Sequence, residues 1–222
     1  MEHFEITKTP EGLHVEGFPD AVKVLRIDGP KAQRLSDLGL HKADLDFALD
    51  CLEEINKVAE ESYVLRQALW RSAVVHYIKC FGDNKSRFSL VPQTVYKDDT
   101  GAMEPYKYFD SLRNKHLVHD ANSYAQCLPG AVLNKKDLSH KIAKIVCMNV
   151  ISETLAKENY NNLHLLVTRA REWVVEQFDQ LCNALTAELE TEPYETLLGR
   201  QGITYTFPGV DEIHKPRIHS NK

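Results

Sequence analysis

The stretch "NYNNLHLLVTRAREWVVEQFDQLCNALTAELE", residues 159–190, indicates the fold class of this chain. Its apolar residues recur at spacings of three and four, so one face stays apolar for about eight turns of an α-helix. Polar and charged residues occupy the opposite face. The apolar face comprises Leu163, Leu166, Val167, Ala170, Trp173, Val174, Phe178, Leu181, Leu185 and Leu189. A face of this length predicts a long amphipathic helix in a helical domain.

Three further stretches predict helices. Residues 43–60 repeat the apolar spacing with acidic residues between, which is typical of an amphipathic helix with a solvated face. Residues 63–82 are apolar nearly all round, which predicts a central helix that ends at Gly82. Residues 106–117 predict a shorter helix. Its inner stripe comprises Phe109, Leu112, His116 and Leu117.

The two ends of the chain carry weaker β signals. Residues 1–30 predict an irregular or β segment, in which Thr9-Pro10-Glu11-Gly12 suits the tight turn of a small hairpin. Residues 202–207 alternate like an edge strand. Residues 205–222 have the character of a loose tail.

Residues 123–150 fit two structures. Their β-branched residues and the Asn134-Lys135-Lys136-Asp137 turn favour a hairpin, although Ile142, Ile145 and Val146 also fit helical spacing. We prefer the strands. The expected fold is therefore a mainly α-helical bundle with a small peripheral β-hairpin, in a single domain of residues 1–222.

Composition and charge limit the classes of function. Hydrophobic residues make up 43% and charged residues 27% of the 222 residues, which is typical of a globular protein and excludes wholesale disorder. The net charge of −5 argues against a protein that binds nucleic acid by bulk electrostatics. A local basic site remains compatible with it, because the charge around a site is what attracts phosphate.

The five cysteines predict a reducing environment. They are odd in number, widely spaced and free of any C-x-x-C pair, which fits neither a disulfide framework nor a zinc knuckle. The N-terminus has no signal-peptide pattern, and no apolar stretch approaches the ~18 residues of a membrane span. We therefore expect a cytoplasmic protein with no membrane partner.

The most unusual stretch is Arg113-Asn114-Lys115-His116-Leu117-Val118-His119. It resembles the R-x(4–6)-H signature of the HEPN superfamily of small helical bundles, in which a polar residue usually follows the arginine. An apolar helix and a short basic loop precede it, so the resemblance covers residues 65–120, about a quarter of the chain. Two other pairs, Arg34 with His41 and Arg71 with His76, fit the spacing but lack this context.

The resemblance implies a metal-independent endoribonuclease, of the kind found in toxin or defence systems. His119 would then be the general acid or base and Arg113 would stabilise the charge of the phosphorane. Asn114 would orient the phosphate or the imidazole. The resemblance also implies a homodimer with the motif at its interface, an RNA substrate, and an antitoxin or another protein as partner. We expect neither a metal nor a cofactor.

Further basic residues are candidates for substrate binding. Lys85, Arg87 and Lys115 would supply the local positive field that the net charge does not. Arg71 and His76 lie in the apolar stretch before the basic loop. A buried charge there must be paired or face a cavity, so the pair either lines the same cleft as Arg113 or belongs to a satisfied core hydrogen-bond network.

Other interpretations remain open. On an ideal helix, residues six apart differ by about 120°, so either the helix ends before His119 or two copies form a composite site. His119 with Asp120 could instead mark a helix C-terminus, and Arg113 a surface residue or salt bridge. His116, His119 and Asp120 could ligate a metal only with a further distant ligand. The alternative function is a non-catalytic HEPN-like module that binds a nucleotide, nucleic acid or protein.

Overall fold

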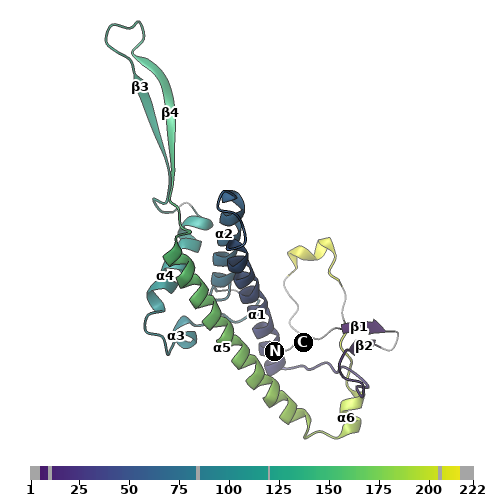
Figure 1. Cartoon of the computed structure of the whole chain (residues 1–222). Helices are drawn as coiled ribbons and strands as arrows, with labels where there is room; N and C mark the ends of the chain where they lie inside the picture. The colour runs from purple at the N-terminus through teal and green to yellow at the C-terminus, as the bar shows by residue number, and fades with distance from the viewer. Residues whose placement is uncertain (1–5, 10–11, 84–85, 120, 205–206, 216–222) are drawn as a thin grey trace. The chain divides into compact units, whose positions relative to one another are not determined.

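The computed structural model describes residues 6–9, 12–83, 86–119, 121–204 and 207–215 of the chain, and it is mainly helical (Figure 1). The helices are α1 (Pro30–Ile55), α2 (Tyr63–Lys79), α3 (Pro92–Val95), α4 (Met103–Leu112), α5 (Lys157–Leu189) and α6 (Tyr194–Gly199), with a π-helical turn η1 (Arg113–Leu117) and a 3-10 turn η2 (Val210–His214). The strands are β1 (Ile6–Thr9), β2 (Gly12–Val15), β3 (Ala125–Leu133) and β4 (Ile142–Ile151). The predicted helical fold with a small β-hairpin is confirmed.

The described chain forms two compact units. Unit 1 contains Met1–Ala43, Asp83–Ser89 and Arg171–Lys222, and unit 2 contains Asp44–Gly82 and Leu90–Ala170. Helices α1 and α5 are each divided, with one part in unit 1 and the other part in unit 2. The single domain of residues 1–222 stays a prediction. None of the described helices is both long and apolar enough to cross a membrane.

Helix α1 begins earlier and ends earlier than the predicted residues 43–60. It starts at Pro30. Proline is well suited to the first turn of a helix, because the N–H that it lacks would have no hydrogen-bond partner there. The buried polar side chains of Asp37 and His41 interrupt the apolar pattern of its first half. The helix ends at Ile55, whose carbonyl accepts a hydrogen bond of 2.7 Å from Nη1 of Arg66.

The β elements form two separate antiparallel pairs. Strand β1 pairs with β2 from Ile6↔Val15 to Thr9↔Gly12, which confirms the predicted hairpin, whereas residues 10–11 of the predicted turn lie outside the described part. Strand β3 pairs with β4 from Ala125↔Ile151 to Leu133↔Ile142, which confirms the preference for strands. The edge strand predicted at 202–207 is reduced to one bridge between Gly202 and Leu25, and residues 205–206 lie outside the described part.

The C-terminal tail is described only in part. Within it, η2 (Val210–His214) is solvent-exposed, and residues 216–222 lie outside the described part.

In unit 1, the loop segment that contains Phe88 is fixed on the first half of α1. His41 Nε2 lies 2.8 Å from the carbonyl oxygen of Phe88, and the guanidinium of Arg34 lies 4.2 Å from the centre of the Phe88 ring. These contacts position Arg87 in a buried place.

The core of unit 2 is aromatic and contains a chain of hydroxyl hydrogen bonds. The hydroxyls of Tyr77 and Tyr96 lie 2.6 Å apart, and the hydroxyl of Tyr96 donates to the carbonyl of Leu166 at 3.1 Å. Both rings are buried. Burial, together with the neighbouring Tyr96, raises the pKa of Tyr77 well above its usual range, and burial raises the pKa of Tyr106 to about 12.

Replacing Tyr96 by Phe tests this chain of hydroxyls. The change leaves the Tyr77 hydroxyl and the Leu166 carbonyl buried without their partner, so we expect unfolding in urea to show a loss of about 1–3 kcal/mol. Tyr63→Phe is the matched control, because Tyr63 is 58% exposed. Equal losses in the two variants would contradict this account.

The buried Tyr77 and Tyr96 and the half-buried Tyr106 also predict a loss of stability at alkaline pH. Their pKa values are raised in the folded chain, so their contribution is complete below the ordinary tyrosine pKa of 10.0. Above that pH the unfolded chain releases protons that the folded chain retains, and the free energy of unfolding falls as the pH approaches 12. Urea unfolding at a series of pH values measures the slope. In Tyr106→Phe the slope should be shallower, and an unchanged slope would refute the assignment.

Candidate functional site

The Arg113 motif begins where α4 changes its geometry. Helix α4 ends at Leu112 and continues into the π-helical turn η1 (Arg113–Leu117). The N–H of Val118 donates to the carbonyl of Arg113 at 3.1 Å, five residues back instead of four. Such wide turns are rare, and they occur frequently at functional sites. The turn lies next to α2 in unit 2.

Asn114 holds the guanidinium of Arg113. Nη1 of Arg113 donates to Oδ1 of Asn114 at 2.7 Å, and Nδ2 of Asn114 donates to Oδ1 of Asp110 at 2.9 Å. The orientation of the amide follows from its neighbours, because a guanidinium only donates and a carboxylate only accepts. The amide of Asn114 therefore links the guanidinium of Arg113 to the carboxylate of Asp110. Within the described chain the guanidinium forms no direct ion pair.

Two buried polar atoms of the motif lack partners. Nε of Arg113 and Nδ1 of His116 are buried and make no hydrogen bond within the part of the chain that the structure describes. Buried polar groups are usually bonded, and an unbonded one often marks a site for water or an ion. A fixed guanidinium with unused N–H groups and no direct counterion is suited to an anion.

A group of aromatic and polar side chains lies beside the motif. The rings of His116 and Tyr124 meet edge to face, with centroids 5.6 Å apart. Nδ2 of Asn159 donates to the hydroxyl of Tyr108 at 3.1 Å and to the carbonyl of Thr154 at 2.9 Å. Burial, and then the neighbouring Tyr124, raises the pKa of Tyr108. The sequence analysis did not identify these side chains or Asp110. Only Asp110 could have been found from the sequence, because it lies four residues before Asn114, where side chains of a helix meet.

His119 lies beyond the end of the π-helical turn. The turn ends at Leu117, and the His119 side chain is exposed. A π turn places Val118 over Arg113, so His119 follows one position later. Within the described residues, Arg113 and His119 form no hydrogen bond with each other. Asp120 lies outside the described part.

The other predicted site residues have different surroundings. Lys115 is exposed on η1, Arg71 is exposed on α2, and Arg87 is buried in unit 1. Lys85 lies outside the described residues. His76 is half-buried, and its Nδ1 donates to Oδ1 of Asp44 at 2.8 Å, an oxygen that also accepts from Lys79 at 2.9 Å. Arg71 and His76 therefore do not share one environment.

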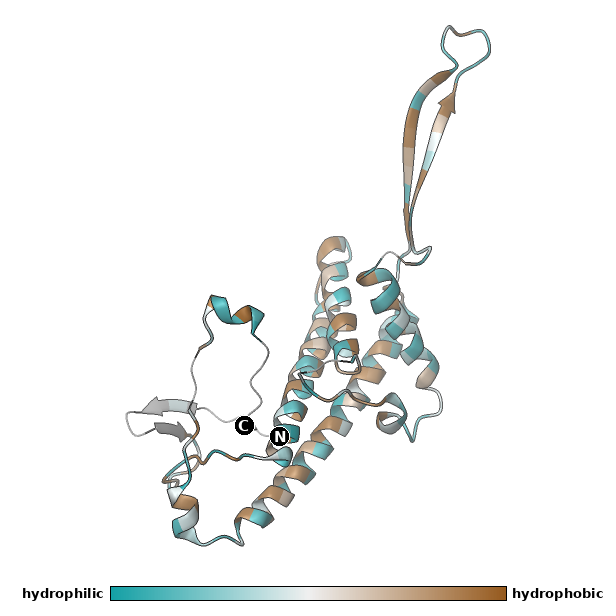
Figure 2. Ribbon diagram, turned by 180° about the vertical axis from the view of Figure 1, so that it is seen from behind, coloured by the Kyte–Doolittle hydropathy of each residue, from teal (hydrophilic) through white to brown (hydrophobic). Residues whose placement is uncertain are grey.

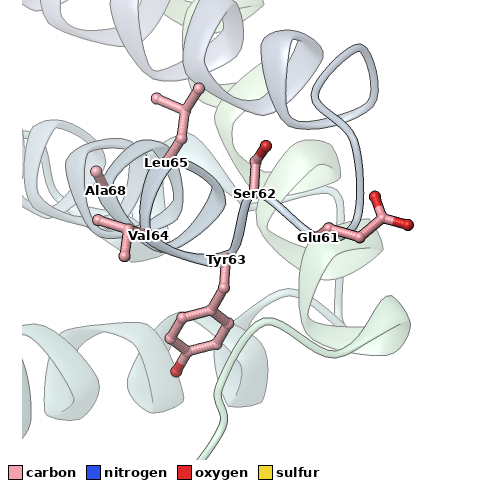
Figure 3. A pocket seen from close by; sticks show the side chains of 6 residues that line it. All are labelled: Glu61, Ser62, Tyr63, Val64, Leu65 and Ala68. Atoms are coloured by element: carbon pink, nitrogen blue, oxygen red, sulfur yellow. The ribbon is translucent and has the colours of Figure 1, made fainter.

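A shallow hollow at the start of α2 is separate from these residues. Figure 3 shows the side chains that line it, which are Glu61, Ser62, Tyr63, Val64, Leu65 and Ala68. They come from one short segment, and most are apolar or small. None of the predicted site residues lines the hollow. Among the described residues, no group of three or more His, Cys, Asp or Glu side chains could hold a metal ion.

Asn114→Ala tests whether the amide bridge is a structural link. The change removes the hydrogen bonds to Arg113 and Asp110, which are half-buried, so we expect a loss of about 1 kcal/mol in the free energy of unfolding. Lys115→Ala is the control on the same turn, because its side chain is exposed. A stability of Asn114→Ala equal to that of Lys115→Ala would show that the bridge contributes nothing.

Comparisons with known proteins leave the motif as the basis of any functional inference. A comparison of the chain with protein-family models, with curated proteins and with solved structures found no match in any of the three. The resemblance to the HEPN signature therefore stands on the residues from Arg113 to His119 and on their surroundings.

Proposed function

We propose that the chain is a HEPN-like, metal-independent endoribonuclease with Arg113, Asn114 and His119 in its site. The observation that supports it is the guanidinium of Arg113, held by Asn114 on a π-helical turn and without a direct counterion in the described chain. This group is positioned for a phosphate. The exposed His119 follows on the same segment and is accessible to a substrate.

The proposed reaction needs one stabilised charge and two proton transfers. The 2′-oxygen of a ribose attacks its own 3′-phosphate, and the bond from phosphorus to the 5′-oxygen of the next nucleotide breaks. The products are a 2′,3′-cyclic phosphate and a 5′-hydroxyl. Arg113 stabilises the charge on the phosphorane, and His119 accepts the proton of the 2′-hydroxyl or donates one to the leaving oxygen. Water or the same motif in a second copy supplies the other transfer.

Substrate attraction depends on local charge, since the chain as a whole carries −5. Lys115 is exposed beside Arg113 and suits a contact with the RNA backbone. Arg71 is exposed and able to meet phosphate, whereas His76 is engaged with Asp44. Arg87 is buried, which shields it from a polymer. The proposed setting is the cytoplasm, in a toxin or defence role with an antitoxin or another protein as partner.

A second function has its own supporting observation. Both groups of the Asn114 amide are occupied, and His119 makes no hydrogen bond with Arg113 within the described residues. This arrangement suits a non-catalytic HEPN-like module, in which Arg113 holds the phosphate of a nucleotide or nucleic acid without proton transfer. The two functions differ in what His119 contributes.

Cleavage of end-labelled single-stranded RNA and transfer RNA in EDTA tests the proposal. We expect the wild type to leave 2′,3′-cyclic phosphate ends, and Arg113→Ala and His119→Ala to lose about 100-fold or more of the rate. Matched controls are Lys107→Ala, an exposed cation on α4, and His140→Ala, an exposed imidazole outside the motif. Both controls should cleave at the wild-type rate.

Two kinds of result would contradict the nuclease proposal, and they lead to different conclusions. Wild-type protein that does not cleave RNA, or variants that cleave as fast as the wild type, would refute the nuclease. Binding of a labelled nucleotide or RNA that Arg113→Ala loses and His119→Ala keeps, without cleavage, would establish the binding module instead.

A further inference from the structure

The hairpin of β3 and β4 is an arm that the described chain leaves uncovered. Figure 1 shows it extending away from α2 and α4, and β4 is the only strand with which β3 pairs in the described chain. Apart from Ala125, which is half-buried, every residue of the two strands is exposed. Figure 2 shows hydrophobic segments along both strands. Exposed apolar surface of this kind is typical of an interaction site.

The outer end of the hairpin, residues 131–144, is basic, and we call it the arm tip. It holds four lysines and one aspartate, a net +3, whereas the remainder of the chain carries −8 of the total −5. Two of its leucines, Leu133 and Leu138, are 74% and 56% exposed. The lysines are Lys135, Lys136, Lys141 and Lys144, which are exposed and make no ion pair in the described part of the chain.

Hydrogen bonds fix the shape of the arm tip. The backbone N–H of Asn134 donates to the carbonyl of Lys141 at 2.8 Å, and Nδ2 of Asn134 donates to the carbonyl of His140 at 2.9 Å. The N–H of Leu138 closes a turn on the carbonyl of Lys135 at 3.1 Å. A surface that is already ordered loses less conformational entropy when it binds a partner.

An acidic surface lies where α1 ends and α2 begins. Residues 50–68, which we call the acceptor surface, hold five carboxylates, Lys57 and Arg66, a net −3. The carboxylates are those of Asp50, Glu53, Glu54, Glu60 and Glu61, and all are exposed. Glu54 pairs with Lys57 at 3.1 Å, and the other four make no ion pair among the described residues. The surface therefore attracts a cationic partner.

The acceptor surface also contains the shallow hollow at the start of α2 (Figure 3). Tyr63, Val64 and Leu65 line it and are 58%, 80% and 50% exposed. An apolar centre beside unpaired charges is the composition of a protein interface, with its apolar core and polar rim. The arm tip has the same composition with the opposite charge.

The two surfaces belong to unit 2, but the ribbon keeps them apart within one molecule. At the base of the hairpin, Nδ-type amide contact is made by Gln67, whose Nε2 donates to Oε1 of Glu153 at 2.7 Å. The base therefore lies beside the acceptor surface. The nine residues of β3 place the arm tip about 30 Å farther out. A second copy brings a tip and an acceptor surface together without bending the ribbon.

A reciprocal contact of two copies has the size of a stable interface. Thirteen residues of the arm tip and thirteen of the acceptor surface are exposed, which makes 26 residues a side. A standard interface uses about 20–30 residues a side. In a twofold dimer each copy contributes both surfaces, so the tip of one arm meets the base of the other.

We propose that the arm tip of one molecule docks on the acceptor surface of a second copy of this chain, and that the second arm tip docks on the first molecule in the same way. Each contact joins net charges of +3 and −3, and it covers the exposed leucines of the tip with the apolar hollow. The contact uses none of the motif residues, so it does not rest on the proposed nuclease function.

Two charge reversals test the pairing. Lys135→Glu with Lys136→Glu gives a tip variant, and Glu60→Lys with Glu61→Lys gives an acceptor variant. Each variant places like charges in both contacts of its own homodimer. Sedimentation should show a dimeric wild type, and a dissociation constant that rises at least about 100-fold in either variant.

An equal mixture of the two variants is the decisive measurement. In a heterodimer the reversed tip of one molecule meets the reversed acceptor surface of the other, and the second contact has its original charges. We therefore expect the mixture to dimerise with about the affinity of the wild type, measured by sedimentation with the tip variant fluorescently labelled. The matched control is Lys97→Glu with Lys107→Glu, which changes the net charge as the tip variant does at exposed cations outside both surfaces. It should dimerise like the wild type.

Each other result overturns the proposal. A wild type that is monomeric at every concentration would mean that another molecule covers the arm. A dimer that survives both reversals would place the interface elsewhere, for example at the motif. A mixture that stays monomeric would show that the tip does not meet the acceptor surface, and a control that dissociates would reduce the effect to net charge. If a reversal lowers the helical signal in circular dichroism, Lys135→Gln with Lys136→Gln makes the comparison without added charge.

Discussion

The hydroxyl of Tyr96 is the interaction on which unit 2 depends. A tyrosine can be buried in an apolar core only when its hydroxyl finds partners, and this one meets the hydroxyl of Tyr77 on α2 and the carbonyl of Leu166 on α5. Two helices far apart in the sequence are thereby fixed to each other. Trp70 repeats the principle on α2, where its indole N–H donates to Thr154 at 3.0 Å. The π-helical turn of the motif lies next to α2, so its position follows from this core.

Apolar spacing predicted the helices well where the buried face is continuous. Residues 159–190 agree with α5 (Lys157–Leu189) to within two residues at each end, because one apolar face continues through the whole stretch. The first half of α1 was missed, since Asp37 and His41 are buried polar residues in positions where the pattern requires apolar ones. Their place depends on contacts with Phe88, which lies far along the chain, so no local pattern could indicate them.

The candidate site was predictable only in its local part. Arg113 and Asn114 are neighbours in the sequence, and their hydrogen bond needs no distant residue. The π-helical turn arises where α4 ends beside α2, and its effect is to carry His119 past the helix and into solvent. Tyr124 meets His116 because the chain turns back after the motif, and Asn159 reaches Tyr108 from α5. Such contacts come from tertiary structure, and residue spacing does not encode them.

Tyr124 connects the motif with the hairpin. Its ring lies against His116, and its carbonyl accepts a hydrogen bond of 2.8 Å from the N–H of Ser152, which closes the base of the ribbon. A displacement of Tyr124 would therefore disturb both the motif and the base of the hairpin. Leu128 and Met148 lie opposite each other farther along the strands, so substitutions there leave the closed base in place. For this reason substitutions in the outer part of the hairpin and substitutions in the motif act on separate parts of the chain, although the two parts meet at Tyr124.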